Sequence, residues 1–565
     1  MRQIDKANEV LNGTATTNYA GALTTAQETN LVEVNRARAD IEALIEGPSG
    51  PPGPFTVHLT NISGTFNFEM SAAGNFTVDW GDGSAIQTIS KPISFSTYSH
   101  NYTSVGNYDV VIGGVATEYS IGSDSSAISF SGSTNKARIT GISGDLGAVF
   151  PILGNTDNQK PKFFYTFSNC TGLTSIPTGL FFSISGSPGV SMFAGMFNGC
   201  NNIASTIPSG FFSTLSGAPA QYMFSNTFFG CSSLTGAIPA NLFSGISGAP
   251  ARGMFGSTFY NCTGLTGAIP SGLFSGISGT PAQDMFSSTF LDCSGLTGSI
   301  PPGLFGIISG VPAGNMYTGT FSGCSSLTGS IPPGLFGNIS GNYSYVTNLF
   351  RATFKNCTGL TGSIPTGMFG TSLTGTPPSY MFEQTFYNCT GLTGSIPPGL
   401  FGTPSGTPLT YIFAGTFWNC SGLTGSIPPG LFGNISGTPS SGMFQSTFSD
   451  CSGLTGSIPA GLFGTFTGAP ANFMFEWTFA GCTGLTGIED GIWDISGMSN
   501  TLNTSAFSNM FNGCTGLISE SPSIKAGSPI KIWEHFTSFY NPYTFRNATN
   551  LSDYGNIPLN WSWPY

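Results

Sequence analysis

Charged residues are scarce in this sequence. Asp, Glu, Lys and Arg make up only 7% of its 565 residues, whereas roughly a quarter is usual in soluble domains. The 15 Lys and Arg residues form no basic stripe, which excludes electrostatic capture of nucleic acid. No segment approaches the ~20 consecutive apolar residues that a membrane-spanning helix needs, so we expect no insertion into a membrane.

Histidine is scarcer still, and its scarcity argues against catalysis. The three histidines, His58, His100 and His535, lie outside the repeated region described below. In that region carboxylates are too sparse to pair, and no glycine-rich phosphate loop precedes a helix. A metal site would need clustered ligands. We therefore expect no enzymatic activity, no catalytic or metal-binding residue and no cofactor.

The sequence does contain a long repeat. Its 12 cysteines recur at intervals of 30 to 33 residues, each within the same short sequence motif. A fixed period of this length is the signature of a solenoid, so we expect one stacked array over residues 161–515. The cysteines are Cys170, Cys200, Cys231, Cys262, Cys293, Cys324, Cys357, Cys389, Cys420, Cys451, Cys482 and Cys514.

One unit of the repeat, residues 443–463, indicates its local structure. Phe444, Phe448 and Cys451 recur at spacings of four and three, which predicts the inward face of one or two helical turns. Leu454 and Ile458 follow in a short extended segment, before a Gly-Leu-Phe step. A single unit could not bury these side chains, whereas a stack of units can. The predicted fold class is an α/β repeat solenoid with short strands and short helices.

The cysteines allow two interpretations. Stacked repeats bring equivalent atoms to roughly 5 Å, which is within the Cα separation that a disulfide tolerates. Each thiol would then have two equivalent neighbours, and all thiols would point the same way. We expect mainly a ladder of free, buried thiols that pack as small apolar side chains, with disulfide bridging as the alternative.

Two segments resemble known families. The Met-Phe-Asn-Gly-Cys motifs at 196–200 and 510–514 resemble the leucine-rich repeats of BspA-like proteins on bacterial and phage surfaces. This resemblance implies a leucine-rich-repeat-like array. Two motifs resemble the PKD domain: Val-Asp-Trp-Gly-Asp-Gly-Ser at 78–84 and His-Asn-Tyr at 100–102. That family implies an immunoglobulin-like spacer or interaction module. Asp79 and Asp82 are expected to form the turn, with calcium ligation as the alternative.

The residues before the array divide into four segments. Residues 1–46 carry a capping box, Thr25 to Glu28, and apolar residues near heptad spacing, which predicts a helical anchor or coiled coil. Residues 47–54 carry Gly at 47, 50 and 53, the starts of three consecutive Gly-X-Y triplets, and form either the collagen-like neck of a homotrimer or a stiff linker. Alternating residues at 55–59 and 107–112 predict strands of a small β-sandwich over 55–116. Residues 117–160 are expected to cap the array.

The last segment, residues 516–565, contains a terminal repeat. Thr544-Phe-Arg-Asn-Ala548-Thr-Asn-Leu551 repeats the signature with Ala in place of Cys. The aromatic residues around it are expected to form a lid over the last apolar face, with a sugar-stacking platform as the alternative. These aromatic residues are Trp533, Phe536, Trp561, Trp563 and Tyr565.

These features favour a non-enzymatic appendage of a virion, a head or tail fibre. In this interpretation residues 1–46 bind capsid or tail proteins, and the neutral, hydroxyl-rich array makes weak multivalent contacts with glycans or proteins of the host surface. The sequence begins Met1-Arg2-Gln3-Ile4 without the apolar run of a secretion signal, which favours release by lysis. The alternative is a BspA-like adhesin on a bacterial cell surface. A third interpretation is binding to ice or crystals through stacked threonines, from Thr235 to Thr455.

Overall fold

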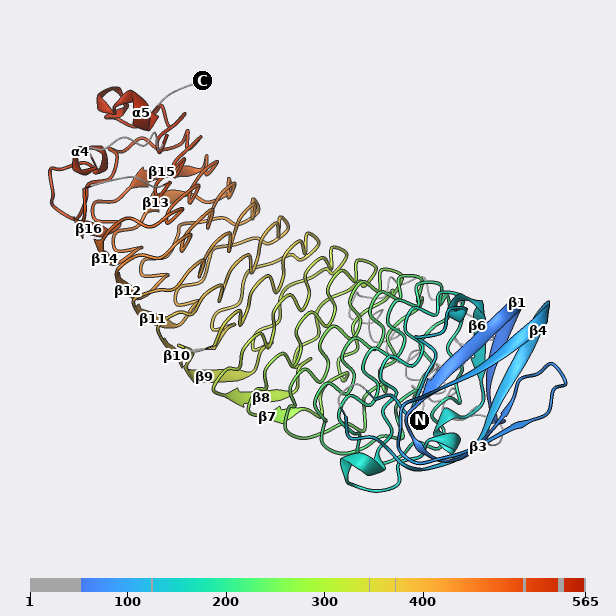
Figure 1. Ribbon diagram of the computed structural model, residues 1–565. Helices are drawn as coiled ribbons and strands as arrows, with labels where there is room; N and C mark the ends of the chain where they lie inside the picture. Colours follow the sequence, from blue (N-terminus) through green and yellow to red (C-terminus); the bar gives the residue numbers. More distant parts are fainter. Residues whose placement is uncertain are drawn as a thin grey trace, which may run out of the picture. The chain divides into compact units, whose positions relative to one another are not determined.

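The computed structural model describes residues 52–122, 125–344, 346–370, 372–500, 505–536 and 543–562. All of them belong to one compact unit, Pro52–Tyr565, in which an antiparallel sheet is followed by stacked coils (Figure 1). The predicted anchor at 1–46, residues 47–51 of the predicted neck at 47–54, Trp563 and Tyr565 lie outside the described residues.

The first element is a six-stranded antiparallel sheet with the order β3-β2-β4-β1-β5, in which β6 also pairs with β1. The predicted strands at 55–59 and 107–112 are confirmed as parts of β1 and β4, where Phe55 faces Ile112 and Val57 faces Val110. All four of these side chains are buried, as their alternation predicts. The strands are β1 (Phe55–Met70), β2 (Ala73–Asp79), β3 (Gln87–Lys91), β4 (Ser96–Glu118), β5 (Ile128–Ser129) and β6 (Ile139–Ser143).

This sheet differs from the small β-sandwich predicted for residues 55–116. Its strands form one hydrogen-bonded sheet, and two of them, β5 and β6, come from the segment predicted to be a cap. The apolar face packs on the first coil, where the Phe55 ring of β1 lies 6.4 Å from the Phe167 ring between centroids. Phe130, which follows β5, stacks on the same Phe167 ring at 5.4 Å. Backbone amides of Ala127 and Phe130 donate to carbonyls of that coil, so this segment covers the open end of the array.

The array is a parallel β-solenoid in which eight strands, β7 to β12, β14 and β16, lie side by side along one edge of the stack (Figure 1). Each coil runs in the same direction, so neighbouring strands pair in parallel. The eight-stranded sheet contains β7 (Ser278–Gly279), β8 (Ile307–Gly310), β9 (Asn338–Asn342), β10 (Ser372–Gly375), β11 (Thr403–Gly406), β12 (Asn434–Gly437), β14 (Thr465–Gly468) and β16 (Asp494–Met498). A second sheet pairs β13 (Gly456–Ile458) with β15 (Leu485–Ile488).

The segment before each cysteine is a chain of turns, which corrects the prediction of short helices there. Every fourth residue of this segment has a left-handed backbone, as at Gly442, Ser446 and Asp450. Such residues break the helical ladder, and the amides of Phe444 and Phe448 donate instead to carbonyls of the next coil. The described residues of 161–515 contain no helix, so the α/β class is not confirmed.

Short helices occur only outside the array among the described residues. They are the α-helices α3 (Leu146–Val149), α4 (Ile532–His535) and α5 (Leu559–Ser562), and the 3₁₀ helices η1 (Lys136–Arg138), η2 (Asp157–Gln159) and η3 (Tyr554–Asn556).

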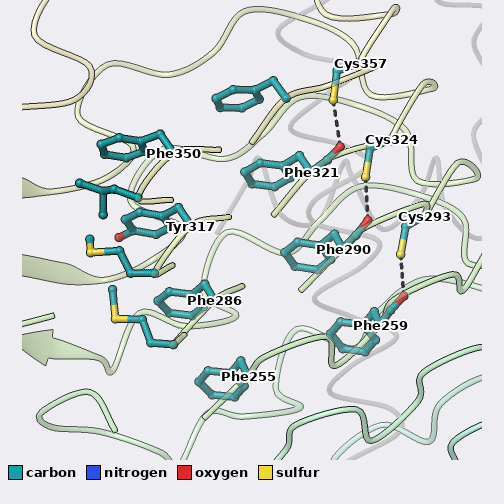
Figure 2. Close-up of a cluster of buried hydrophobic side chains, with 14 of the residues drawn as sticks. Phe255, Phe259, Phe286, Phe290, Cys293, Tyr317, Phe321, Cys324, Phe350 and Cys357 are labelled. Carbon is teal, nitrogen blue, oxygen red and sulfur yellow. Dashed lines mark hydrogen bonds between the residues drawn. The ribbon is translucent and has the colours of Figure 1, made fainter. Parts of the chain in front are cut away.

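The core of the array consists of aromatic columns that run along the stack (Figure 2). One column contains the Phe three residues before each cysteine, and its successive rings from Phe167 to Phe545 stack with centroids 5.4 to 5.9 Å apart. A second column contains the aromatic residue seven before each cysteine, such as Phe286, Tyr317 and Phe350. The predicted inward positions of the 443–463 unit are therefore confirmed, since all are at most 1% exposed.

All 12 cysteines are buried and free, which confirms the thiol ladder and not disulfide bridging. Each Sγ from Cys200 onward donates to the carbonyl of a Phe in the preceding coil, as Cys293 does to Phe259 and Cys324 to Phe290 (Figure 2). A buried Thr makes a parallel link: Thr447 Oγ1 donates to the carbonyls of Phe444 and of Phe413, one coil earlier. Burial raises the pKa of Cys200 and Cys514 to about 12, so the thiols stay protonated donors.

The C-terminal segment continues this packing. Phe545 stacks on Phe511 at 5.4 Å, and Ala548 is buried at the place of the cysteine, as the terminal repeat predicts. Trp561 and Phe536 are 2% and 1% exposed. These two rings therefore belong to a lid and not to an exposed sugar-stacking platform.

The Asp-Gly turn of the sheet is expected to make stability depend on pH. Asp79 and Asp82 accept hydrogen bonds from the amides of Gly81 and Ser84, as the turn interpretation predicts. Hydrogen bonds from Ser84 and His100 lower the pKa of Asp82 from 3.8 to about 2. Since the pKa is lower in the folded state, the ionised carboxylate stabilises the sheet above about pH 4, and this contribution is lost as the pH falls towards 2.

We expect Asp82→Asn to lower the temperature of unfolding at neutral pH and to leave it unchanged at about pH 2, where the native carboxyl is becoming protonated. Circular dichroism in the β-sheet region at both pH values measures the effect. An equal loss at both pH values would show that the charge of Asp82 does not stabilise the sheet.

Candidate ligand-binding face

Between Phe163 and Ile488, charge is confined to one face of the array. We call the ten residues before each cysteine the turn ribbon, because these segments lie on one another as chains of turns. Every Asp, Glu, Lys and Arg between Phe163 and Ile488 lies in the turn ribbon. They are Arg252, Asp284, Asp292, Arg351, Lys355, Glu383, Asp450 and Glu476.

Accessible aromatic side chains gather on the same face. Among the described residues of 163–488, Phe182 is the one aromatic residue outside the turn ribbon that is not buried. The half-buried and exposed rings of the ribbon are Phe164, Tyr165, Tyr222, Phe229, Tyr260, Tyr380, Tyr387, Tyr411, Trp418, Phe473 and Trp477. The turn ribbon thus holds nearly all the side chains of the array that could recognise a ligand by stacking or by charge.

The face that follows each cysteine is different. It carries Thr, Gly and Ser or Ala in nearly every coil, and the threonines from Thr235 to Thr455 are exposed in one column. The Thr235 hydroxyl donates to the carbonyl of Ala204 in the preceding coil, so it contributes to stacking. The side chains on this face are nearly the same in every coil, whereas the side chains of the turn ribbon differ from coil to coil.

Cations of the turn ribbon lie over aromatic rings. The guanidinium of Arg252 is 5.6 Å from the Tyr222 centroid, and that of Arg351 is 5.3 Å from the Tyr380 centroid. Arg351 also pairs with Glu383 of the next coil. These cation–π contacts and ion pairs hold the ribbon side chains in fixed positions across neighbouring coils.

A hollow lies on the turn ribbon towards the C-terminal end of the array, and we call it the C-terminal groove. Its volume is about 620 Å³, within the range of small-molecule sites. It is lined by Glu383, Gln384, Tyr411, Ala414, Gly415, Trp418, Gln445, Ser446, Ser449, Asp450, Glu476, Trp477, Ala480, Gly481 and Asn512.

Hydrogen bonds between coils orient the polar groups of the C-terminal groove. Trp418 Nε1 donates to Asp450 Oδ2 at 3.1 Å, and Gln445 Nε2 donates to Glu476 Oε2 at 2.6 Å. Burial raises the pKa of Glu476, and the hydrogen bond from Gln445 partly opposes this shift. Tyr411 stacks on Tyr380 with centroids 5.6 Å apart. The groove therefore presents fixed aromatic rings beside carboxylate and amide groups.

A smaller hollow of about 310 Å³ lies on the same ribbon near the N-terminal end of the array. It is lined by Phe164, Tyr165, Ser191, Ala194, Tyr222, Ser225 and Asn226. Its residues occupy the same register positions as those of the C-terminal groove, so one face carries both hollows.

Several ribbon aromatics have a backbone conformation that is costly for large side chains. Tyr411 and Trp477 have φ of 55° and 57°, in the left-handed region. At the equivalent positions, some other coils carry Gly442, Gly415 and Asn509, which adopt this conformation more readily. A bulky side chain at such a place suggests a role other than stability.

The histidines do not come together. His58 contacts Asp109 and Ser143, His100 contacts Asp82, and the ring of His535 contacts the carbonyl of Met498. Within the described ranges, no group of three or more His, Cys, Asp or Glu side chains is placed to hold a metal ion. Nor is any helix of the described residues long and apolar enough to cross a bilayer.

Sequence reasoning identified no site residue, and the groove residues were missed. One feature of the sequence could have identified them. Aromatic and charged residues that interrupt the Gly, Ser and Thr pattern of the repeat lie within the ten residues before a cysteine. Comparisons with protein-family models, with curated proteins and with solved structures found no match. The assignment of function therefore depends on the geometry of the turn ribbon.

Proposed function

We propose that this protein is a non-enzymatic adhesive appendage of a virion, a head or tail fibre, which binds glycans or proteins of a host surface through the turn ribbon. The observation that carries the proposal is the concentration of charged and accessible aromatic side chains on one face of the array. Such a face suits recognition because the scaffold behind it is rigid and repetitive. Two hollows on the ribbon allow more than one contact per chain, which favours weak multivalent binding.

The rest of the proposal concerns the N-terminal part of the chain. Residues 1–46 would bind capsid or tail proteins, and the Gly-X-Y neck at 47–54 would join three chains into a homotrimer. The sheet that follows would act as a spacer of the PKD-like kind, and the array resembles BspA-like repeats. A BspA-like adhesin on a bacterial cell surface is the alternative, since its array would use the same face.

Antibodies raised against the array distinguish the two locations. Immunogold electron microscopy should label fibres on purified virions if the protein is an appendage. Labelling of intact bacterial cells, with none on virions, would contradict the virion assignment and support the cellular adhesin.

Adhesion itself is expected to depend little on salt. The array carries few charges, and Arg252 and Arg351 are already paired with carboxylates, so screening removes little of the binding free energy. The labelled full-length chain should therefore bind host cells to a similar extent at low and high salt. A loss of roughly a hundredfold at high salt would show that charge, and not stacking and hydrogen bonding, drives adhesion.

A further inference from the structure

The C-terminal groove is lined by aromatic rings from separate coils, together with small and polar residues. Trp418 and Trp477 belong to coils that are two steps apart along the stack, a separation of roughly 10 Å at the usual spacing of paired strands. The coil between them contributes the small residues Ser446 and Ser449. An elongated ligand could therefore lie along the stack and contact a different ring with each of its units.

The chemistry of the lining favours hydroxyl groups as ligands. Asp450 and Glu476 each receive a hydrogen bond from a neighbouring side chain, and a carboxylate can accept several. The lining contains no Lys or Arg. The groove therefore offers hydrogen-bond acceptors to donors such as sugar hydroxyls, and it repels anions.

The ring of Trp477 comes at a cost to folding. Trp477 is 37% exposed, so its ring gains only part of the stabilisation of a buried side chain. Its backbone has φ of 57°, which Gly or Asn would adopt with less strain. A large, partly exposed ring at a strained position is expected where the ring contacts a ligand.

We propose that the C-terminal groove binds a neutral oligosaccharide, with sugar rings stacked on Trp418, Trp477 and Tyr411 and hydroxyls donating to Asp450 and Glu476. This inference rests on the proposed adhesive function and names its ligand class. Aromatic rings provide the stacking surface for the apolar faces of sugars, and the carboxylates provide the orientation.

The test uses the full-length chain with defined tetrasaccharides of N-acetylglucosamine, glucose, galactose and mannose, and with tetragalacturonate as an anionic counterpart. At least one neutral tetrasaccharide should change the tryptophan fluorescence and give a saturable isotherm by calorimetry. Tetragalacturonate should not bind. Failure of all four neutral sugars to bind would overturn the inference, as would stronger binding of tetragalacturonate.

Two variants locate the site. Trp477→Asn keeps a residue suited to the left-handed backbone, and it should weaken sugar binding roughly thirtyfold while leaving the unfolding temperature unchanged. Trp418→Ala should weaken binding comparably. The control Tyr260→Ala removes a ring from the register position of Trp418 on a coil that lines neither hollow, and it should bind as the native chain does. Unchanged binding in both tryptophan variants would overturn the inference.

Cell adhesion separates this inference from the proposed function. If the native chain binds a neutral tetrasaccharide but no cell, the adhesive function fails and the sugar site stands. If Trp477→Asn loses tetrasaccharide binding and keeps full adhesion, the sugar site again stands while adhesion uses another part of the surface. Binding of a trimethylammonium compound in place of every sugar would identify a cation cage and overturn the inference.

Discussion

Phe448→Ala is expected to destabilise the array by about 3 to 5 kcal/mol, because it leaves a cavity in a continuous aromatic column. The Phe448 ring is fully buried and stacks on Phe417 and Phe479, with centroids 5.6 and 5.4 Å away. The loss is a large part of the stability of an ordinary domain. In a stack where each coil contacts only its neighbours, it should also uncouple the coils on either side.

Urea unfolding, followed by circular dichroism and by tryptophan fluorescence, measures this effect. The native array should give one transition with both probes, and Phe448→Ala should give an earlier transition that the two probes report differently. Phe182→Ala is the control, because the Phe182 side chain is 47% exposed, and it should cost less than about 1 kcal/mol. Equal losses in the two variants would contradict the column as the source of stability.

Gly464→Ala is expected to have an effect of similar size for a different reason. A Cβ at Gly464 would lie 2.1 Å from the carbonyl oxygen of Ile435 in the preceding coil, and the backbone has φ of 71°. The left-handed conformation costs about 1 to 2 kcal/mol for Ala. The forced separation of two coils adds about 1 to 3 kcal/mol, as other overpacked sites do.

Gly461 provides a matched control in the same coil. Its φ is 68°, but a Cβ there would meet no atom within 4 Å. Gly461→Ala should therefore cost only the conformational part, about 1 to 2 kcal/mol. The difference between the two variants in the free energy of unfolding, measured with urea, reports the cost of the close contact between coils at Gly464. Equal losses in the two variants would contradict this close contact.

The core of the array could be predicted from the sequence, whereas the structure of the turn ribbon could not. The period placed Phe444, Phe448 and Cys451 on the inward face, and all three are fully buried. Their spacing of four and three is equally compatible with a helix and with consecutive turns. The backbone at Ser446 and Asp450 decided between them, because left-handed residues end a helix and turn the amides towards the next coil.

The N-terminal sheet shows a similar limit. Alternation identified the strands around Phe55 and Ile112, because period-two burial is a local property. It could not show what covers the sheet. Rings of Phe130 and Phe167, which are distant in sequence from the first strand, provide the covering layer in place of a second sheet.

By itself the sequence determined that the chain is a solenoid, which residues form its core and that its cysteines need not be bridged, since these follow from period and composition. Only the tertiary structure decided which residues come together on the face that carries the charged and accessible aromatic side chains. Trp418, Asp450 and Trp477 lie on different coils. They line one groove because stacking brings the turn ribbons of successive coils to roughly 5 Å from one another, however far apart the residues are along the chain.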